Sequence, residues 1–196
     1  MDKQQPDDQT QTPTTDTAEL LRVRREKLNQ MRERGIEPFG GKFEISHGLA
    51  ALRAGFADEK KVRIAGRVSA RRDMGKSIFF DISDIEGRFQ CFLNAQNAGD
   101  ESFATFKELV DIGDWVGVDG ETFTTKVGEP SIKVAQLTVL SKSMRPMPGK
   151  WHGVVDPEIK YRQRYLDLIS NERSREIFVT RSKMIAEMRR YMADRD

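Results

Sequence analysis

The chain has 196 residues, of which 33% are charged and 37% hydrophobic, with a mean hydropathy of -0.62. This composition is typical of a soluble globular protein with one ordinary core, and it indicates no membrane role. The formal net charge of +2 is too small to indicate nucleic-acid binding by itself. The single cysteine, Cys91, excludes an internal disulfide and is expected in the core.

Residues 1–16 contain no aromatic or branched aliphatic side chain. Such a segment buries too little apolar surface to offset the entropy lost on ordering, so we expect it to be disordered. It has neither the apolar stretch of a secretory signal nor the arginine-rich pattern of a transit peptide, which favours the cytoplasm.

Residues 17–58 are expected to form a helix and a connector. Asp16 or Thr17 can cap a helix that ends near Arg34, just before Gly35. One stripe of this helix is apolar, at Leu20, Leu21, Leu28 and Met31, and the neighbouring stripe is mainly basic, at Arg22, Arg25, Asn29 and Arg32. The basic stripe fits a solvated helix balanced by glutamates and a phosphate-binding helix about equally well.

Residues 59–143 alternate apolar and polar side chains, which predicts β-strands. The expected strands cover 62–68, 78–83, 89–93, 115–118 and 132–139, and a short amphipathic helix begins near Asp100, between the third and fourth. Five strands with a helix in that place are the layout of an OB-fold, a small Greek-key barrel that commonly binds oligonucleotides. We therefore predict a mainly β protein, with a five-stranded OB-fold barrel and flanking helices.

Strict alternation places Phe79 on the outer face of its strand, while Ile78 and Phe80 point into the barrel. An exposed aromatic ring at this place is a platform on which an unpaired base can stack. Gln90 faces outward on the adjacent strand by the same parity, and its amide can donate and accept at a base edge. The alternative is that Phe79 packs under a neighbouring loop.

Three basic residues surround the turn between the first two strands, namely Arg71, Arg72 and Lys76. They could neutralise phosphates or bond to a base, although simple solvation also explains them. No catalytic pattern accompanies them. His47 and His152 lie far apart, and the sequence contains no P-loop, dinucleotide-binding motif or metal-ligand spacing.

Residues 144–160 include prolines and glycines that indicate a linker. Residues 161–196 return to helical spacing from about Ser174, with an apolar face at Ile177, Met184, Ile185, Met188 and Met192. Nothing else in the chain is expected to cover that face, so we expect further sequence or a partner to cover it.

Two stretches, RRDMGKSIFFDISDIEGRFQCFL at 71–93 and KWHGVVDPEIKYRQRYLDLISNERSREIF at 150–178, resemble bacterial class II lysyl-tRNA synthetases. The second resembles the beginning of the family's catalytic domain, and the resemblance covers about residues 20–196. It implies a basic helix and an OB barrel that together grip the anticodon arm of a lysine tRNA, whose anticodon is rich in U.

The resemblance also implies roles for single residues. Phe79 and Gln90 match family residues that stack on and read the middle U. Arg72 matches a residue that contacts the anticodon, and Glu129 matches one that helps to fix a neighbouring base. Glu129 is reached only through the resemblance. Phosphate contacts are expected from Arg22, Arg25, Arg32, Arg71 and Lys76.

The segment from Ser174 to Asp196 resembles the long helix of class II motif 1, which packs across the family's homodimer axis. The remainder of motif 1 and the two motifs that hold ATP and the adenylate are not in this sequence. The resemblance thus implies a parent lysine-tRNA ligase that uses ATP and Mg²⁺, and residues 161–196 as the start of its catalytic domain. This chain alone is expected to bind tRNA without catalysis, and no DNA or membrane partner is expected.

Rival interpretations remain open. An aspartyl or asparaginyl relative shares the OB layout, although the KWHG and KYRQRYLDL stretches argue against it. A general single-strand-binding OB protein would bind many sequences without preference for a UUU anticodon. A paralogue that lysylates a translation factor lacks an OB domain, so the predicted barrel disfavours it.

Overall fold

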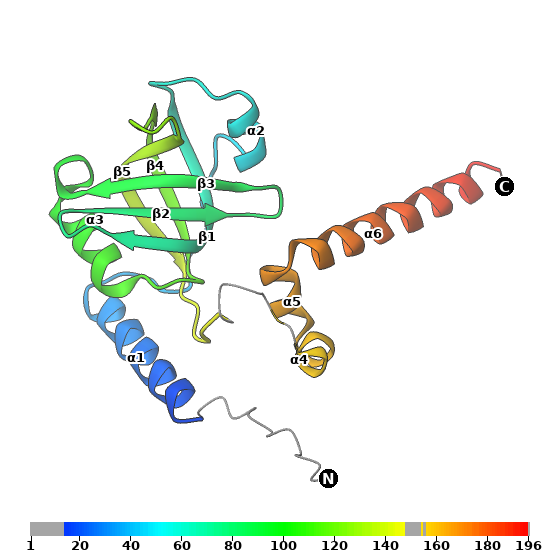
Figure 1. The fold of residues 1–196 in the computed structure, drawn as a ribbon, viewed down its shortest axis with the longest axis horizontal. Helices are drawn as coiled ribbons and strands as arrows, with labels where there is room; N and C mark the ends of the chain where they lie inside the picture. Colours follow the sequence, from blue (N-terminus) through cyan, green and yellow to red (C-terminus); the bar gives the residue numbers. More distant parts are fainter. Residues whose placement is uncertain (1–13, 148–153, 155, 196) are drawn as a thin grey trace, which may run out of the picture. The chain divides into compact units, whose positions relative to one another are not determined.

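The computed structural model describes residues 14–147, 154 and 156–195 (Figure 1). These residues divide into two compact units, with the boundary between Pro146 and Met147. No described helix is long and apolar enough to cross a membrane.

The first unit opens with helix α1, Thr14–Glu33. Of the segment predicted to be disordered, residues 1–13 lie outside the described residues, but residues 14–16 belong to this helix. That part of the prediction is wrong, because the first turn of a helix leaves its N–H groups without intrahelical partners and so accepts polar residues such as Thr and Asp. Met31 of the predicted apolar stripe is fully buried, whereas Leu20 stays 42% exposed.

A second short helix, α2, covers Leu49–Ala54 within the segment expected to be a connector. This helix buries its Leu49 and Leu52 side chains in the main hydrophobic core. The sequence pattern did not indicate this helix, since one and a half turns are too short for a clear period.

Five strands follow, with one helix between the third and the fourth. They are β1 Lys61–Asp73, β2 Ser77–Ser83, β3 Arg88–Asn94, β4 Trp115–Thr124 and β5 Pro130–Ser141, with α3 at Ala95–Leu109. The strand order β1-β2-β3-β5-β4 closes on itself, because β1 also pairs with β4. All pairs are antiparallel except β3 with β5. The five-stranded OB layout with flanking helices is confirmed.

Helix α3 begins five residues earlier than the sequence suggested. The side chain of Asn94 caps its start by accepting a hydrogen bond from the Asn97 backbone N–H at 2.9 Å. Gly99 then interrupts the helical backbone with φ 79°, a value that glycine adopts without strain. The expected start near Asp100 is the point at which regular helix resumes.

The barrel interior is filled by the residues that alternation had pointed inward. Ile78, Phe80 and Ile82 of β2 are 0% exposed, as are Phe89, Cys91 and Leu93 of β3. Burial raises the pKa of the Cys91 thiol, so this residue is the inert core side chain that its setting predicted. Since side chains alternate along a strand, the odd residues of β2 and the even residues of β3 face outward.

The second unit consists of helices α4 Pro157–Arg162, α5 Arg164–Ser170 and α6 Glu172–Ala193. The prediction of a linker over residues 144–160 is wrong at its end, because residues 157–160 belong to helix α4. Asp156 caps α4 by accepting a hydrogen bond from the Glu158 N–H at 2.7 Å, and Pro157 fits the first helical position. The rest of that linker lies partly outside the described residues.

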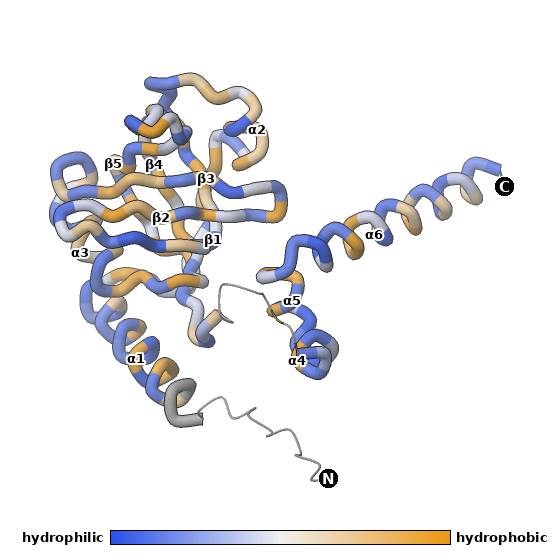
Figure 2. Tube along the Cα trace, viewed as in Figure 1, coloured by the Kyte–Doolittle hydropathy of each residue, from blue (hydrophilic) through white to orange (hydrophobic). Residues whose placement is uncertain are grey.

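Helix α6 carries no buried residue. Its apolar side chains include Ile177, Met184, Met188 and Met192, which are 52%, 57%, 58% and 67% exposed. Figure 2 shows hydrophobic positions recurring between hydrophilic ones along α6, as they also do along α1. Within the described residues, the apolar face of α6 is uncovered.

Candidate nucleic-acid interface

One row of side chains runs across the outer face of four strands. Arg72 of β1 is paired with Phe79 of β2, Phe79 with Phe92 of β3, and Phe92 with Lys133 of β5. Paired residues on neighbouring strands point to the same face of a sheet. We call this set, Arg72, Phe79, Phe92 and Lys133, the stacking row.

The aromatic members of the stacking row contact one another. The rings of Phe79 and Phe92 are 4.9 Å apart, and the ring of Phe123 from β4 lies 6.0 Å from Phe92. Lys133 places its Nζ 5.8 Å from the Phe123 ring. All three rings are half-buried, so they form an aromatic surface on the barrel wall rather than part of its interior. No neighbouring loop encloses Phe79 completely.

A second row lies one register step along the same face. It contains Asp81 of β2, Gln90 of β3 and Ser131 of β5, which are paired in that order. The Ser131 hydroxyl donates to Gln90 Oε1 at 2.8 Å. Among the described residues, the amide nitrogen of Gln90 donates to no acceptor. Its donors are therefore available to a ligand lying on the face.

Glu129 approaches this face from the turn between β4 and β5. Its carboxylate accepts from Arg53 of α2 at 3.3 Å, and Arg53 also donates to the Arg88 carbonyl of β3 at 3.2 Å. Gly128, with φ 82°, makes the turn that leads into Glu129. Sequence reasoning from parity missed Glu129, since a turn carries no alternation and α2 had not been predicted.

Arg71 and Arg72 are neighbours with different surroundings. The Arg72 side chain is 56% exposed beside Asp81. Arg71 instead donates to the carbonyls of Phe106, Lys107 and Val110 at the end of α3, over 2.9 to 3.3 Å. It serves as a cap for that helix, which leaves it poorly placed for the predicted phosphate contact. Lys76 is exposed in the β1–β2 turn.

The basic stripe of α1 is exposed, at Arg22, Arg25 and Arg32. Arg22 is engaged within its own helix, with ion pairs to Glu19 at 2.5 Å and Glu26 at 2.7 Å. Its hydrogen bond and charge lower the pKa of Glu19. Arg25 and Arg32 have no ion pair among the described residues, so they are the freer cations of the stripe.

Helix α1 is held against the barrel by a charged network. Arg24 is buried and donates to the carbonyls of Ser143 and Ile112 at 2.6 and 2.9 Å. Lys27 pairs with Asp111 at 2.5 Å, and the fully buried Lys142 bonds the same carboxylate at 2.6 Å. These contacts fix α1 beside α3, at the end of the barrel away from α2 (Figure 1).

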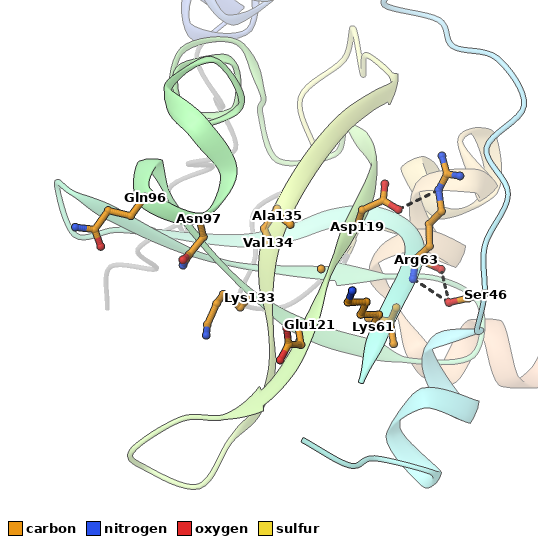
Figure 3. Close-up of a pocket in the computed structure, with 12 residues that line it drawn as sticks. Ser46, Lys61, Arg63, Gln96, Asn97, Asp119, Glu121, Lys133, Val134 and Ala135 are labelled. Atoms are coloured by element: carbon orange, nitrogen blue, oxygen red, sulfur yellow. Dashed lines mark hydrogen bonds and ion pairs between the residues drawn. The ribbon is translucent and has the colours of Figure 1, made fainter. Parts of the chain in front are cut away.

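A groove of about 610 Å³ lies between β1, β4, β5 and the start of α3, and Lys133 belongs both to this groove and to the stacking row (Figure 3). Glu121 lies in register between Lys61 and Lys133 there, and Arg63 pairs with Asp119 at 3.2 Å. Because its charges are mixed and partly paired, this groove is less suited to an anionic backbone than the face with the stacking row.

Comparison with known proteins bears on the rival interpretations. Residues 62–140 match the OB-fold nucleic acid binding domain family of the tRNA anticodon type. The chain is 46% identical over 179 residues to the lysine-tRNA ligase of Moorella thermoacetica, and 49% identical over 186 residues to that of Shouchella clausii. The resemblance to lysine-tRNA ligases is confirmed.

A third such ligase, from Bacillus cytotoxicus, is 49% identical over 183 residues. The alignments to these lysine-tRNA ligases take in 89% or 90% of the chain but only 36% or 37% of the relatives. The chain therefore spans little more than a third of the length of the curated relatives it matches.

Proposed function

We propose that this chain recognises the anticodon of a lysine tRNA as part of a lysine-tRNA ligase. The observation that carries the proposal is the convergence of Phe79, Gln90, Arg72 and Glu129 on one outer face of a barrel whose strands match an anticodon-binding family.

The face has the chemistry that reading an unpaired base requires. A base stacked on Phe79 would gain about 1 to 3 kcal/mol from the ring contact. Its edge would then lie over Gln90, whose amide nitrogen is available, and next to the exposed guanidinium of Arg72. Glu129, held by Arg53, is positioned to meet a neighbouring base.

Phosphates of the anticodon arm would be met by basic residues on either side of this face. Arg25 and Arg32 of α1 supply exposed cations near one end of the barrel, and Lys76 supplies another in the β1–β2 turn. Such contacts add affinity without sequence preference and weaken with added salt. Arg22 and Arg71 are less favoured because each is bonded to other groups of the protein.

The activity proposed for the whole protein is ATP-dependent attachment of lysine to its tRNA through a lysyl-adenylate, with Mg²⁺. Among the described residues there is no group of three or more His, Cys, Asp or Glu that could hold a metal ion, so we assign no residue here to ATP or Mg²⁺. We also propose that α4 to α6 begin the catalytic domain and that the exposed apolar face of α6 packs in a homodimer. A cytoplasmic location stays a prediction.

A titration with two RNA hairpins tests the proposal. One is the anticodon stem-loop of a lysine tRNA with UUU, and the other carries C in place of the middle U. We expect binding to weaken at least about tenfold on this change, and unrelated oligonucleotides to compete poorly. Equal binding to both hairpins would instead identify a general single-strand-binding OB protein.

A further inference from the structure

Asp81 is a carboxylate in the middle of the proposed reading face. It stands directly opposite Gln90 across β2 and β3, and it lies two residues from Phe79 on the same face of β2. Its side chain is only 10% exposed. A negative charge with so little contact with water, on a surface proposed to bind RNA, calls for a physical reason.

Two arginines bracket the carboxylate. Arg72 Nη2 lies 4.0 Å from Oδ1, and Arg88 Nη1 lies 3.8 Å from Oδ2. Both separations are longer than a direct hydrogen bond. Among the described residues no group donates a hydrogen bond to these two oxygens, so both can accept a hydrogen bond from a ligand.

The three side chains form a pattern of donor, acceptor and donor. The pairing edge of uracil has the complementary pattern, with the imino N3–H between two carbonyl oxygens. Cytosine presents a bare N3 acceptor at the same place, and that lone pair would face the carboxylate. We propose that Asp81 is a specificity-determining residue that accepts a hydrogen bond from the N3–H of the middle uracil, between Arg72 and Arg88; this rests on the proposed function.

The variant Asp81→Asn tests this in the full chain, with the UUU stem-loop and the same loop carrying a middle C. An asparagine amide donates to the cytosine N3, so the wild-type preference of at least about tenfold should fall below about threefold. Binding to the C loop should tighten in absolute terms, because one acidic charge has left the face. A loss of folding alone would weaken both hairpins together.

The matched control is Asp119→Asn, which removes a strand carboxylate paired with Arg63 in the groove between β1, β4 and β5. It should keep the wild-type preference. If Asp81→Asn keeps that preference as well, the inference is overturned while the proposed function stands. If the wild-type chain itself binds both hairpins equally, the proposed function fails, and the inference fails with it.

A change in the RNA gives a second test that does not require the variant to fold. The middle uridine is replaced by 3-methyluridine, which lacks the N3 proton, or by 5-methyluridine, which keeps it. Wild-type protein should bind the 3-methyl hairpin at least about tenfold more weakly than the 5-methyl hairpin. Equal binding to the two would show that no group of the protein accepts a hydrogen bond from N3–H, and would overturn the inference.

Discussion

Phe79 and Phe92 face each other across β2 and β3, with ring centroids 4.9 Å apart and an angle of 48° between their planes. Each ring supports the other on the outer wall of the barrel, so Phe79 is held in place without being enclosed by the core. Truncating the Phe79 ring should therefore remove the proposed base contact while leaving the interior packing intact.

The variant Phe79→Ala should therefore weaken binding to the UUU stem-loop by about 1 to 3 kcal/mol, with little loss of stability. Phe80→Ala is the matched control, because Phe80 is the adjacent residue, 0% exposed inside the barrel. That change should lower the free energy of unfolding by about 3 to 5 kcal/mol. Urea unfolding and hairpin titration measure the two effects. A stability loss at Phe79 equal to that at Phe80 would contradict an outward role.

Arg71 and Arg72 should separate stability from binding in the same way. Arg71→Ala removes its hydrogen bonds to three carbonyl groups at the end of α3, so the free energy of unfolding should fall by about 1 to 3 kcal/mol. Arg72→Ala should leave unfolding nearly unchanged and weaken hairpin binding. Thermal melts measure the stability of each variant, and hairpin titrations measure its binding. The assignment of Arg71 to stability and Arg72 to binding would be contradicted if Arg72→Ala lowered stability and Arg71→Ala weakened only binding.

The docking of α1 should depend on pH through Asp111. Burial disfavours the charged form of this carboxyl, but hydrogen bonds from Lys142 and Lys27 outweigh it and hold its pKa below the ordinary 3.8. A lowered pKa contributes stability that is fully present above the ordinary value and is lost as pH falls through the lowered one. Unfolding measured from pH 6 downward should show this loss below about pH 4.

Asp111→Asn is the control for that pH dependence. It should be less stable than the wild-type chain at pH 6, by about 1 to 3 kcal/mol, because Lys27 loses its charged partner and Lys142 keeps only Asp114. The difference between the two proteins should narrow below about pH 4, where the wild-type carboxyl also becomes neutral. A constant difference in the free energy of unfolding over the whole pH range would show that Asp111 is not the source of the pH dependence.

The phosphate contacts proposed for α1 should appear in the salt dependence of RNA binding. Replacing Arg25 and Arg32 by alanine should reduce the slope of log affinity against log salt by about 1 for each phosphate that the variant no longer neutralises. The preference for a middle U should not change, because phosphates carry no sequence information. Arg173→Ala, at an exposed arginine of α6, serves as a comparison. An unchanged slope in the double variant would place the RNA backbone elsewhere.

Local periodicity in the sequence was sufficient to predict part of this fold. Alternation of apolar and polar residues predicted the strands and the direction of their side chains, because a strand has only two faces. It correctly pointed Phe79 and Gln90 outward, and it pointed into the barrel the alternate residues of β2 and β3, from Ile78 to Leu93. Phe123 was missed because the predicted fourth strand ended at residue 118, whereas β4 continues to Thr124. The α1 helix was recognised from its apolar spacing, with an error of one turn at its start.

Only the tertiary structure decided which neighbours each outward residue has. Arg71 and Arg72 are adjacent and identical in residue type, yet Arg71 is hydrogen-bonded to the end of α3 whereas Arg72 lies exposed on the outer face of the barrel. Glu129 meets Arg53 across 76 positions of chain, and the ring of paired strands brings Asp81, Gln90 and Ser131 into one row. Periodicity fixes the direction of a side chain, whereas its partners depend on contacts between distant segments, which no local pattern encodes.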